Sequence, residues 1–236
     1  MPGAPDDPPR PPGEEGRGLH ALACVLAASA GCVDAVGFLQ FGGIFVSFMS
    51  GNSTEFGVNI ARGEFLSAAS NAFPIAVFVA GSCVGALIAH FAGRRAFRVV
   101  LLFEVVVLAL AVLLPGDPEQ VSPAFVLVVL AMGAQNAALN RTDAAGVGVT
   151  YVTGTLAKLG RELAARLLGK RERARQLGFH AWLWLSFTAG GLTGGMLYLQ
   201  FAFAALVLPI TVLLGLIVWS VALPHHIESE QAGEAP

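Results

Sequence analysis

The sequence predicts an all-α membrane protein with about six transmembrane helices, built as two inverted three-helix repeats. Three observations lead to this class: hydrophobic residues make up 55% of the chain, charged residues only 13%, and the charges occur in clumps between long apolar stretches. A soluble domain carries about 25% charged residues, so this chain cannot cover a water-facing surface of its size. Apolar stretches of about 20 residues are long enough to cross a hydrocarbon core about 30 Å thick.

Polar ends flank one transmembrane domain. Residues 1–18 are rich in proline, glycine and acidic residues, a composition that does not pack, and residues 224–236 form a second flexible tail. The domain between them covers 19–223, with repeat one at 19–114 and repeat two at 122–223. The predicted spans are Leu19–Leu39, Asn71–Ala92, Phe97–Leu114, Ser122–Asn140, Phe179–Leu199 and Ala202–Leu223.

The distribution of Lys and Arg predicts how these spans are oriented, because short basic loops stay on the cytoplasmic side. The turn containing Arg94, Arg95 and Arg98 is basic, and so is the stretch Lys158–Arg175. The turn Pro115–Val121 has only acidic charges. Six spans place each of these three loops on the side that its charge predicts, and they place both termini in the cytoplasm.

Two segments, 42–62 and 146–158, are neither plain spans nor plain loops. In each, apolar residues lead to a hydroxyl-rich turn at a glycine, Gly51 in the first and Gly154 in the second, and a polar half follows. This pattern is typical of interrupted or re-entrant helices. A loop that only dips into the lipid headgroups is the alternative, and the paired interrupted element is favoured.

The two halves of the chain resemble each other at offsets of 102 to 109 residues. Since each unit has three spans, the second copy must enter the membrane from the opposite side, which agrees with the charge distribution. Inverted repeats with interrupted helices are typical of secondary transporters, whose substrate site lies near the midplane. The matched positions pair 46–51 with 149–154, Asp34 with Asn136, Gly81 with Gly190 and Gly85 with Gly194.

Asp34 is the most informative polar residue, because an aspartate inside a span costs about 2.5–3.5 kcal/mol on insertion scales. Its counterpart Asn136, with Gln135 beside it, keeps a polar group at the matching place. These side chains are expected to bind a cation, a proton or a polar solute, or else only to cap the broken helices. The predicted substrate or ion site comprises Asp34, Ser50, Gly51, Asn52, Gln135, Asn136, Thr153 and Gly154.

Glu104 is a secondary candidate inside the third span. Its counterpart at an offset of 109 is Leu213, so the repeat does not preserve it, and a private structural contact is favoured over a proton relay. Small residues spaced four apart, as in the second and fifth spans, usually mark close helix packing. Gly81, Gly85, Gly190 and Gly194 are therefore read as packing residues, with contact between those two spans expected and a homodimer contact left open.

A basic amphipathic helix is predicted near the end of the second interrupted segment. Leu156, Leu159 and Leu163 recur at helical spacing with basic residues on other faces, as in helices that lie on anionic lipid. A phosphate or nucleotide site is disfavoured, because no phosphate-cradling glycine pattern precedes Gly169-Lys170.

The stretches 31–39, 45–52, 133–138 and 150–154 read GCVDAVGFL, FVSFMSGN, GAQNAA and TYVTG. In these stretches the chain resembles the YoaK-like family of bacterial integral membrane proteins, a group defined by a domain of unknown function. Relatives often have asparagine and threonine where this chain has Phe48 and Ser50. The resemblance covers nearly the whole chain apart from the tails and implies a multi-span bacterial membrane protein with no established substrate.

The leading functional hypothesis is a small secondary transporter or channel for an unidentified small solute or ion. The alternatives are an intramembrane enzyme acting on a lipid or isoprenoid substrate, and a membrane scaffold. No catalytic set, cofactor or metal site is predicted, so an enzyme is not expected. The near balance of 14 basic and 16 acidic residues gives no broad surface for nucleic acid. The expected partners are the lipid bilayer and the solute or ion, with a homo-oligomer left open.

Overall fold

The computed structural model describes residues 14–114, 122–139, 152–170 and 176–222. All regular structure in these residues is helical, which confirms the all-α part of the predicted fold class. Most of both tails and the acidic turn after the third span lie outside the described residues. The α-helices are α1 (Glu14–Gln40), α2 (Met49–Arg62), α3 (Phe65–Ala92), α4 (Ala96–Leu113), α5 (Pro123–Leu139), α6 (Val152–Leu167), α7 (Leu177–Phe201) and α8 (Val207–Ala222); the 3-10 turns are η1 (Gly93–Arg95) and η3 (Ala202–Leu206).

Three helical stretches of the described chain are long and apolar enough to cross a membrane: Gly18–Gln40, Phe65–Leu113 and Leu177–Val221. The second and third stretches each contain two helices joined by a 3-10 turn, and the shorter helix α5 is also apolar. The helices α1, α3, α4, α5, α7 and α8 therefore occupy the six predicted span positions. Helix α3 begins earlier than predicted, because Gly63, with φ of 75°, closes α2 and α3 follows at once.

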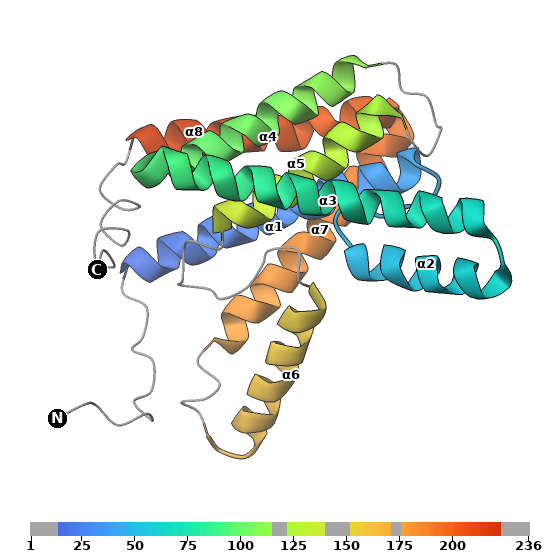
Figure 1. Cartoon of the computed structure of the whole chain (residues 1–236). Coiled ribbons are helices and arrows are strands. Elements are labelled where there is room, and N and C mark those ends of the chain that lie inside the picture. Colours follow the sequence, from blue (N-terminus) through green and yellow to red (C-terminus); the bar gives the residue numbers. More distant parts are fainter. Residues whose placement is uncertain (1–13, 115–121, 140–151, 171–175, 223–236) are drawn as a thin grey trace.

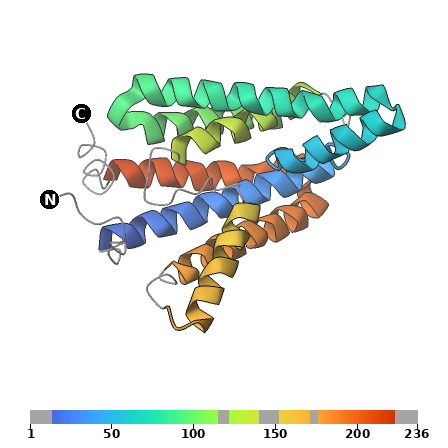
Figure 2. The ribbon, with the colours of Figure 1, turned by 60° about the horizontal axis from the view of Figure 1, so that its bottom comes forward.

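The long helices run side by side, and two of the shorter helices, α2 and α6, lie on the outside (Figures 1 and 2). Helix α1 packs most extensively on α7, and α3 on α5. Helix α2 lies along α3, α6 lies along α7, and α4 contacts both α5 and α8. The first turn of α1 and the last turn of α8 lie at the same end of the bundle.

Glycines allow the helices of the two most extensive pairs, α1–α7 and α3–α5, to approach each other closely. A Cβ atom on Gly81 would overlap the carbonyl oxygen of Leu130 in α5, and one on Gly190 would overlap that of Ala28 in α1. Such backbone-to-backbone approach is open only to glycine. The glycine face of α3 thus packs on α5, and that of α7 packs on α1. The sequence had suggested that these two glycine faces contact each other, and that expectation was wrong.

Gly190 and Gly195 offer a matched test of this packing, because both lie in α7 but a Cβ atom on Gly195 would have no neighbour within 4 Å. We expect Gly190→Ala to lower the free energy of unfolding by about 1–3 kcal/mol, the usual cost of overpacking. Gly195→Ala should leave it unchanged or raise it by up to about 1 kcal/mol, since alanine favours helices. Thermal unfolding of the purified proteins in one detergent measures both, and equal midpoints would contradict the packing argument.

Candidate functional site

The first interrupted segment is a reversal of the chain anchored in the apolar core. After α1 the backbone turns at Gly42 and Gly43, whose φ values are 66° and 90°. Phe41, just before the turn, is fully buried and meets Phe125 and Phe203 edge to face, with ring centroids 5.0 and 5.7 Å apart. These contacts fix the direction in which the chain runs back to α2.

Asp34 holds the segment of this connection that runs back to α2 against α1. Its carboxylate oxygen Oδ1 accepts hydrogen bonds from the backbone N–H groups of Val46 and Ser47, at 3.2 and 2.9 Å. The side chain is 8% exposed, so both hydrogen bonds lie in a largely buried position. The contacts are those of the capping alternative, while binding of an ion or solute by Asp34 stays a prediction.

Asn52 closes the same connection from the α2 side. Its fully buried side-chain amide donates to the carbonyl oxygen of Phe45 at 2.8 Å and accepts from the N–H of Phe45 at 3.2 Å. Gly51 is half-buried, and a Cβ there would collide with the ring of Phe48. Ser50 is exposed. Two of the four first-half candidates therefore satisfy backbone groups, and the glycine leaves room for a phenyl ring.

The second-half candidates lie on α5 and at the start of α6. Asn136 is half-buried and donates to the carbonyl oxygen of Met132 at 3.1 Å. Thr153 is exposed and Gly154 half-buried, both in the first turn of α6. The first part of the second interrupted segment, residues 146–151, lies outside the described residues.

Gln135 is brought to Glu104, a pairing that the sequence did not indicate. Glu104 of α4 is 0% exposed and Gln135 of α5 is 1% exposed. Gln135 lies close enough to Glu104 to act on its carboxyl group as a hydrogen-bonding neighbour, although no carboxyl oxygen or amide atom meets strict hydrogen-bond geometry with any described group. A carboxyl group and an amide therefore lie together in the apolar core with hydrogen-bonding capacity to spare.

Among the described contacts, the predicted site thus divides into two groups. Asp34 and Asn52 hold the α1–α2 connection, whereas Gln135 joins Glu104 between α4 and α5. The pairing of Gln135 with Glu104 was not predictable, since the two residues lie on different helices and no spacing rule relates them.

Sequence reasoning also missed a polar cluster between α2 and α3. Asn59 donates to the amide oxygen of Asn71 at 2.9 Å, and Asn71 donates to the Glu55 carboxylate at 2.8 Å. Asn71 is 5% exposed. The available signal was the spacing of Glu55 and Asn59, which are four residues apart and so share one face of α2.

The role of Asp34 in the connection can be tested with two substitutions. Asp34→Leu leaves the N–H groups of Val46 and Ser47 without an acceptor and should lower the free energy of unfolding by about 2–4 kcal/mol. Asp34→Asn keeps an acceptor oxygen and should cost only about 1 kcal/mol. Thermal unfolding gives the two costs, and hydrogen exchange over residues 41–52 should quicken only in the leucine variant. A leucine variant as stable as the parent protein would contradict the capping role.

Comparison with known proteins identifies the family. Residues 22–219 match the family described as protein of unknown function DUF1275. The chain is 34% identical over 209 residues to the UPF0700 transmembrane protein RA0705 of Rhizobium meliloti, with 89% of each chain covered. It is 27% identical over 161 residues to the UPF0700 transmembrane protein YoaK of Bacillus subtilis, with 65% of this chain and 71% of YoaK covered. No solved structure matches.

The chain therefore belongs to the DUF1275 family, also called UPF0700, and is a multi-pass transmembrane protein of unknown function. This confirms the resemblance read from the sequence.

Proposed function

We propose that this DUF1275 family member is a small secondary transporter or channel, built from two inverted three-helix repeats, that passes a small polar solute or ion along Glu104 and Gln135. We further propose that it lies in the bacterial inner membrane with both termini in the cytoplasm. The proposed role requires passage of a solute and no catalysis. The observation that carries it is the polar pair in the core of the helix bundle, whose hydrogen bonding no described group completes.

Matched glycine contacts support the two repeats. A Cβ on Gly31 would overlap the carbonyl oxygen of Phe187, and a Cβ on Gly133 would overlap that of Phe78. Gly133 follows Gly31 by 102 residues and Phe187 follows Phe78 by 109, the offsets found in the sequence. The same offsets relate the contact of Gly190 with Ala28 to the contact of Gly81 with Leu130. The α1–α7 pair therefore has its counterpart in the α5–α3 pair.

Polar contacts of the short helices follow the same relation. The hydrogen bond between Asn59 of α2 and Asn71 of α3 corresponds to the contact between Glu162 of α6 and His180 of α7, at offsets of 103 and 109. Different side chains thus make an equivalent link in each half. Both links tie the short helix to the long helix that follows it.

The turns after α3 and α7 also match. Gly93 has φ of 53° and ψ of −121°, and Ala202, 109 residues later, has φ of 49° and ψ of −135°. Ala202 is the non-glycine residue with positive φ among the described residues. A residue with a side chain is strained in this region of backbone space. The recurrence of the same backbone conformation at Gly93 and Ala202 therefore supports a common plan for the two halves.

The repeat comparison also explains why Glu104 and Gln135 point to function. Their counterparts are Leu213 and Val33, two fully buried apolar residues of α8 and α1. The equivalent position in the other half is therefore filled without polar groups, and packing does not require a carboxyl group at this place. A buried carboxyl group whose hydrogen bonding is incomplete costs several kcal/mol in a membrane bundle and usually marks the path of an ion or solute.

The inverted arrangement predicts the sides on which two loops lie. Reporter fusions after Gly116 and after Gly169 should lie on opposite sides of the membrane, because an odd number of spans separates them. A periplasm-active phosphatase and a cytoplasm-active fluorescent protein, each fused at both positions, measure this. Two fusions that report the same side would contradict the inverted repeats.

A flux assay tests the proposed role of Glu104. Purified protein in liposomes, exposed to steps of H⁺, Na⁺ or K⁺ on a solid-supported membrane, should give currents above those of empty liposomes. Glu104→Gln should reduce the active current at least about tenfold, because the group that attracts the cation is neutralised.

Glu64→Gln is the matched control, since it makes the same chemical change at an exposed position before α3 and should leave the current unchanged. Equal currents from the Glu104 variant and the parent protein, or no protein-dependent current with any of the three cations, would contradict ion passage at this site.

A further inference from the structure

A groove of about 630 Å³ opens between α3 and α4, beside the 3-10 turn η1 that joins them. Helix α3 lines it with apolar residues spaced three and four apart, which therefore form one continuous face of the helix. These residues are Val84, Leu87, Ile88, Phe91 and Ala92. The charged residue of the described lining is Arg95, so the groove is an apolar stripe with an arginine at the turn.

A small buried cluster holds the two walls of the groove together. Ala89 of α3 packs against Ala96 and Val100 of α4, and all three are buried. Ile88, which lines the groove, packs against this cluster. The groove is thus a fixed feature of the α3–α4 hairpin.

Lipid is the medium that this groove meets. Helices α3 and α4 belong to the stretch Phe65–Leu113, which is long and apolar enough to cross a membrane, and Leu87 and Phe91 are 52% and 82% exposed. From Val84 to Ala92 the groove runs about 12 Å along α3, at 1.5 Å per residue. One leaflet contributes about 15 Å to a hydrocarbon core about 30 Å thick. The groove therefore fits an acyl chain of one leaflet.

The turn end of the groove is positively charged. Arg94, Arg95 and Arg98 lie in or beside the turn, and no aspartate or glutamate occurs between Phe65 and Phe103. Arg94 and Arg98 make other interactions, so Arg95 alone is counted as available to a ligand. Arg95 is exposed and has no partner among the described residues. An anionic group at this end of the groove would therefore balance a free positive charge.

We propose that this groove binds one anionic phospholipid, with an acyl chain along Val84–Ala92 and the phosphate group at Arg95. The turn lies at the same end of the helix bundle as the first turn of α1 (Figure 2), which is where the headgroup belongs when the acyl chain follows α3. The arginine fork matches two phosphate oxygens, and basic pockets beside transmembrane helices suit lipid headgroups. The proposal is independent of the transport pathway proposed above.

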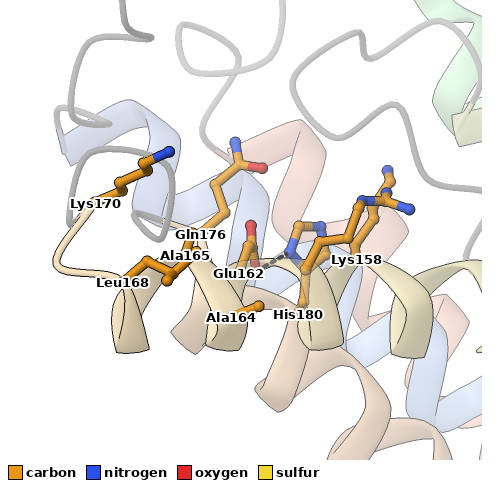
Figure 3. A pocket seen from close by; sticks show the side chains of 9 residues that line it. Lys158, Glu162, Ala164, Ala165, Leu168, Lys170, Gln176 and His180 are labelled. Atoms are coloured by element: carbon orange, nitrogen blue, oxygen red, sulfur yellow. Dashed lines mark hydrogen bonds and ion pairs between the residues drawn. The ribbon is translucent and has the colours of Figure 1, made fainter.

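A second cavity with basic residues, between α6 and α7, differs in its charges (Figure 3). Glu162 lies among its cations, with Oε2 2.9 Å from Nδ1 of His180, and Lys158 has an interaction of its own. An anion in that cavity meets a carboxylate as well as positive charge. The described lining of the α3–α4 groove has no acidic residue, so the groove is the better match for an anionic ligand.

Photo-crosslinking localises the bound lipid. The full-length protein is reconstituted in phosphatidylcholine vesicles with a trace of photoreactive lipid, either phosphatidylglycerol or phosphatidylcholine with the same acyl chains. After irradiation, mass spectrometry measures the labelling of residues 84–99. We expect phosphatidylglycerol to label this segment about fivefold more than phosphatidylcholine, the preference that one basic residue near the surface gives an anionic lipid. Excess glycerol phosphate, a phosphate headgroup without acyl chains, should leave this labelling unchanged.

Two matched pairs of variants test the headgroup and the acyl chain separately. Arg95→Gln should lower phosphatidylglycerol labelling to the phosphatidylcholine level, whereas Arg62→Gln, the same change at an exposed position just before α3 begins, should leave it unchanged. Val84→Phe fills the groove and should also lower this labelling, whereas Ala86→Phe adds the same ring on the opposite, exposed face of α3 and should not. The proposal is overturned if the two lipids label alike, if glycerol phosphate competes, or if either groove variant behaves like its control.

Discussion

Close backbone contact between helices is the constraint on which this bundle depends. In lipid, helices gain little by hiding apolar side chains from one another, so association relies on van der Waals packing where small residues allow it. Gly190 against Ala28 and Gly81 against Leu130 provide that contact for the pairs α1–α7 and α3–α5. The remaining helices are arranged around these pairs, with α2 on α3, α6 on α7, and α4 between α5 and α8.

A second constraint acts where the chain leaves a helix inside the bundle, because free backbone N–H and C=O groups are costly there. Asp34 and Asn52 meet this requirement at the α1–α2 connection by bonding the backbone of residues 45–47. The polar groups of these two side chains are thus taken up by the neighbouring backbone. Glu104 and Gln135 differ, since nothing described completes their hydrogen bonding, and this difference separates structural polar groups from candidate functional ones.

The helices were predictable because their signals are local. Apolar length, basic turns and glycine punctuation placed all six span positions, and the start of α6 at Val152 follows that of α2 at Met49 by the offset read from the sequence. The pairing of helices was not predictable, since a glycine motif indicates close packing but does not specify which helix it packs on. The meeting of Glu104 with Gln135, and of Glu162 with His180, likewise depends on how separate helices are rotated and aligned, which single-chain periodicity does not encode.

The pairing of α1 with α7 has a consequence for biosynthesis. A chain is made from its N-terminus, and domains tend to fold as they emerge, yet Ala28 and Cys32 find Gly190 and Gly194 only after most of the protein has been translated. Until then the small-residue face of the first span has lipid or the insertion machinery as its neighbour. Neither half can complete its own packing, so the two halves are interdependent folding units, and a prematurely terminated chain leaves an unmatched helix surface for quality-control proteases to recognise.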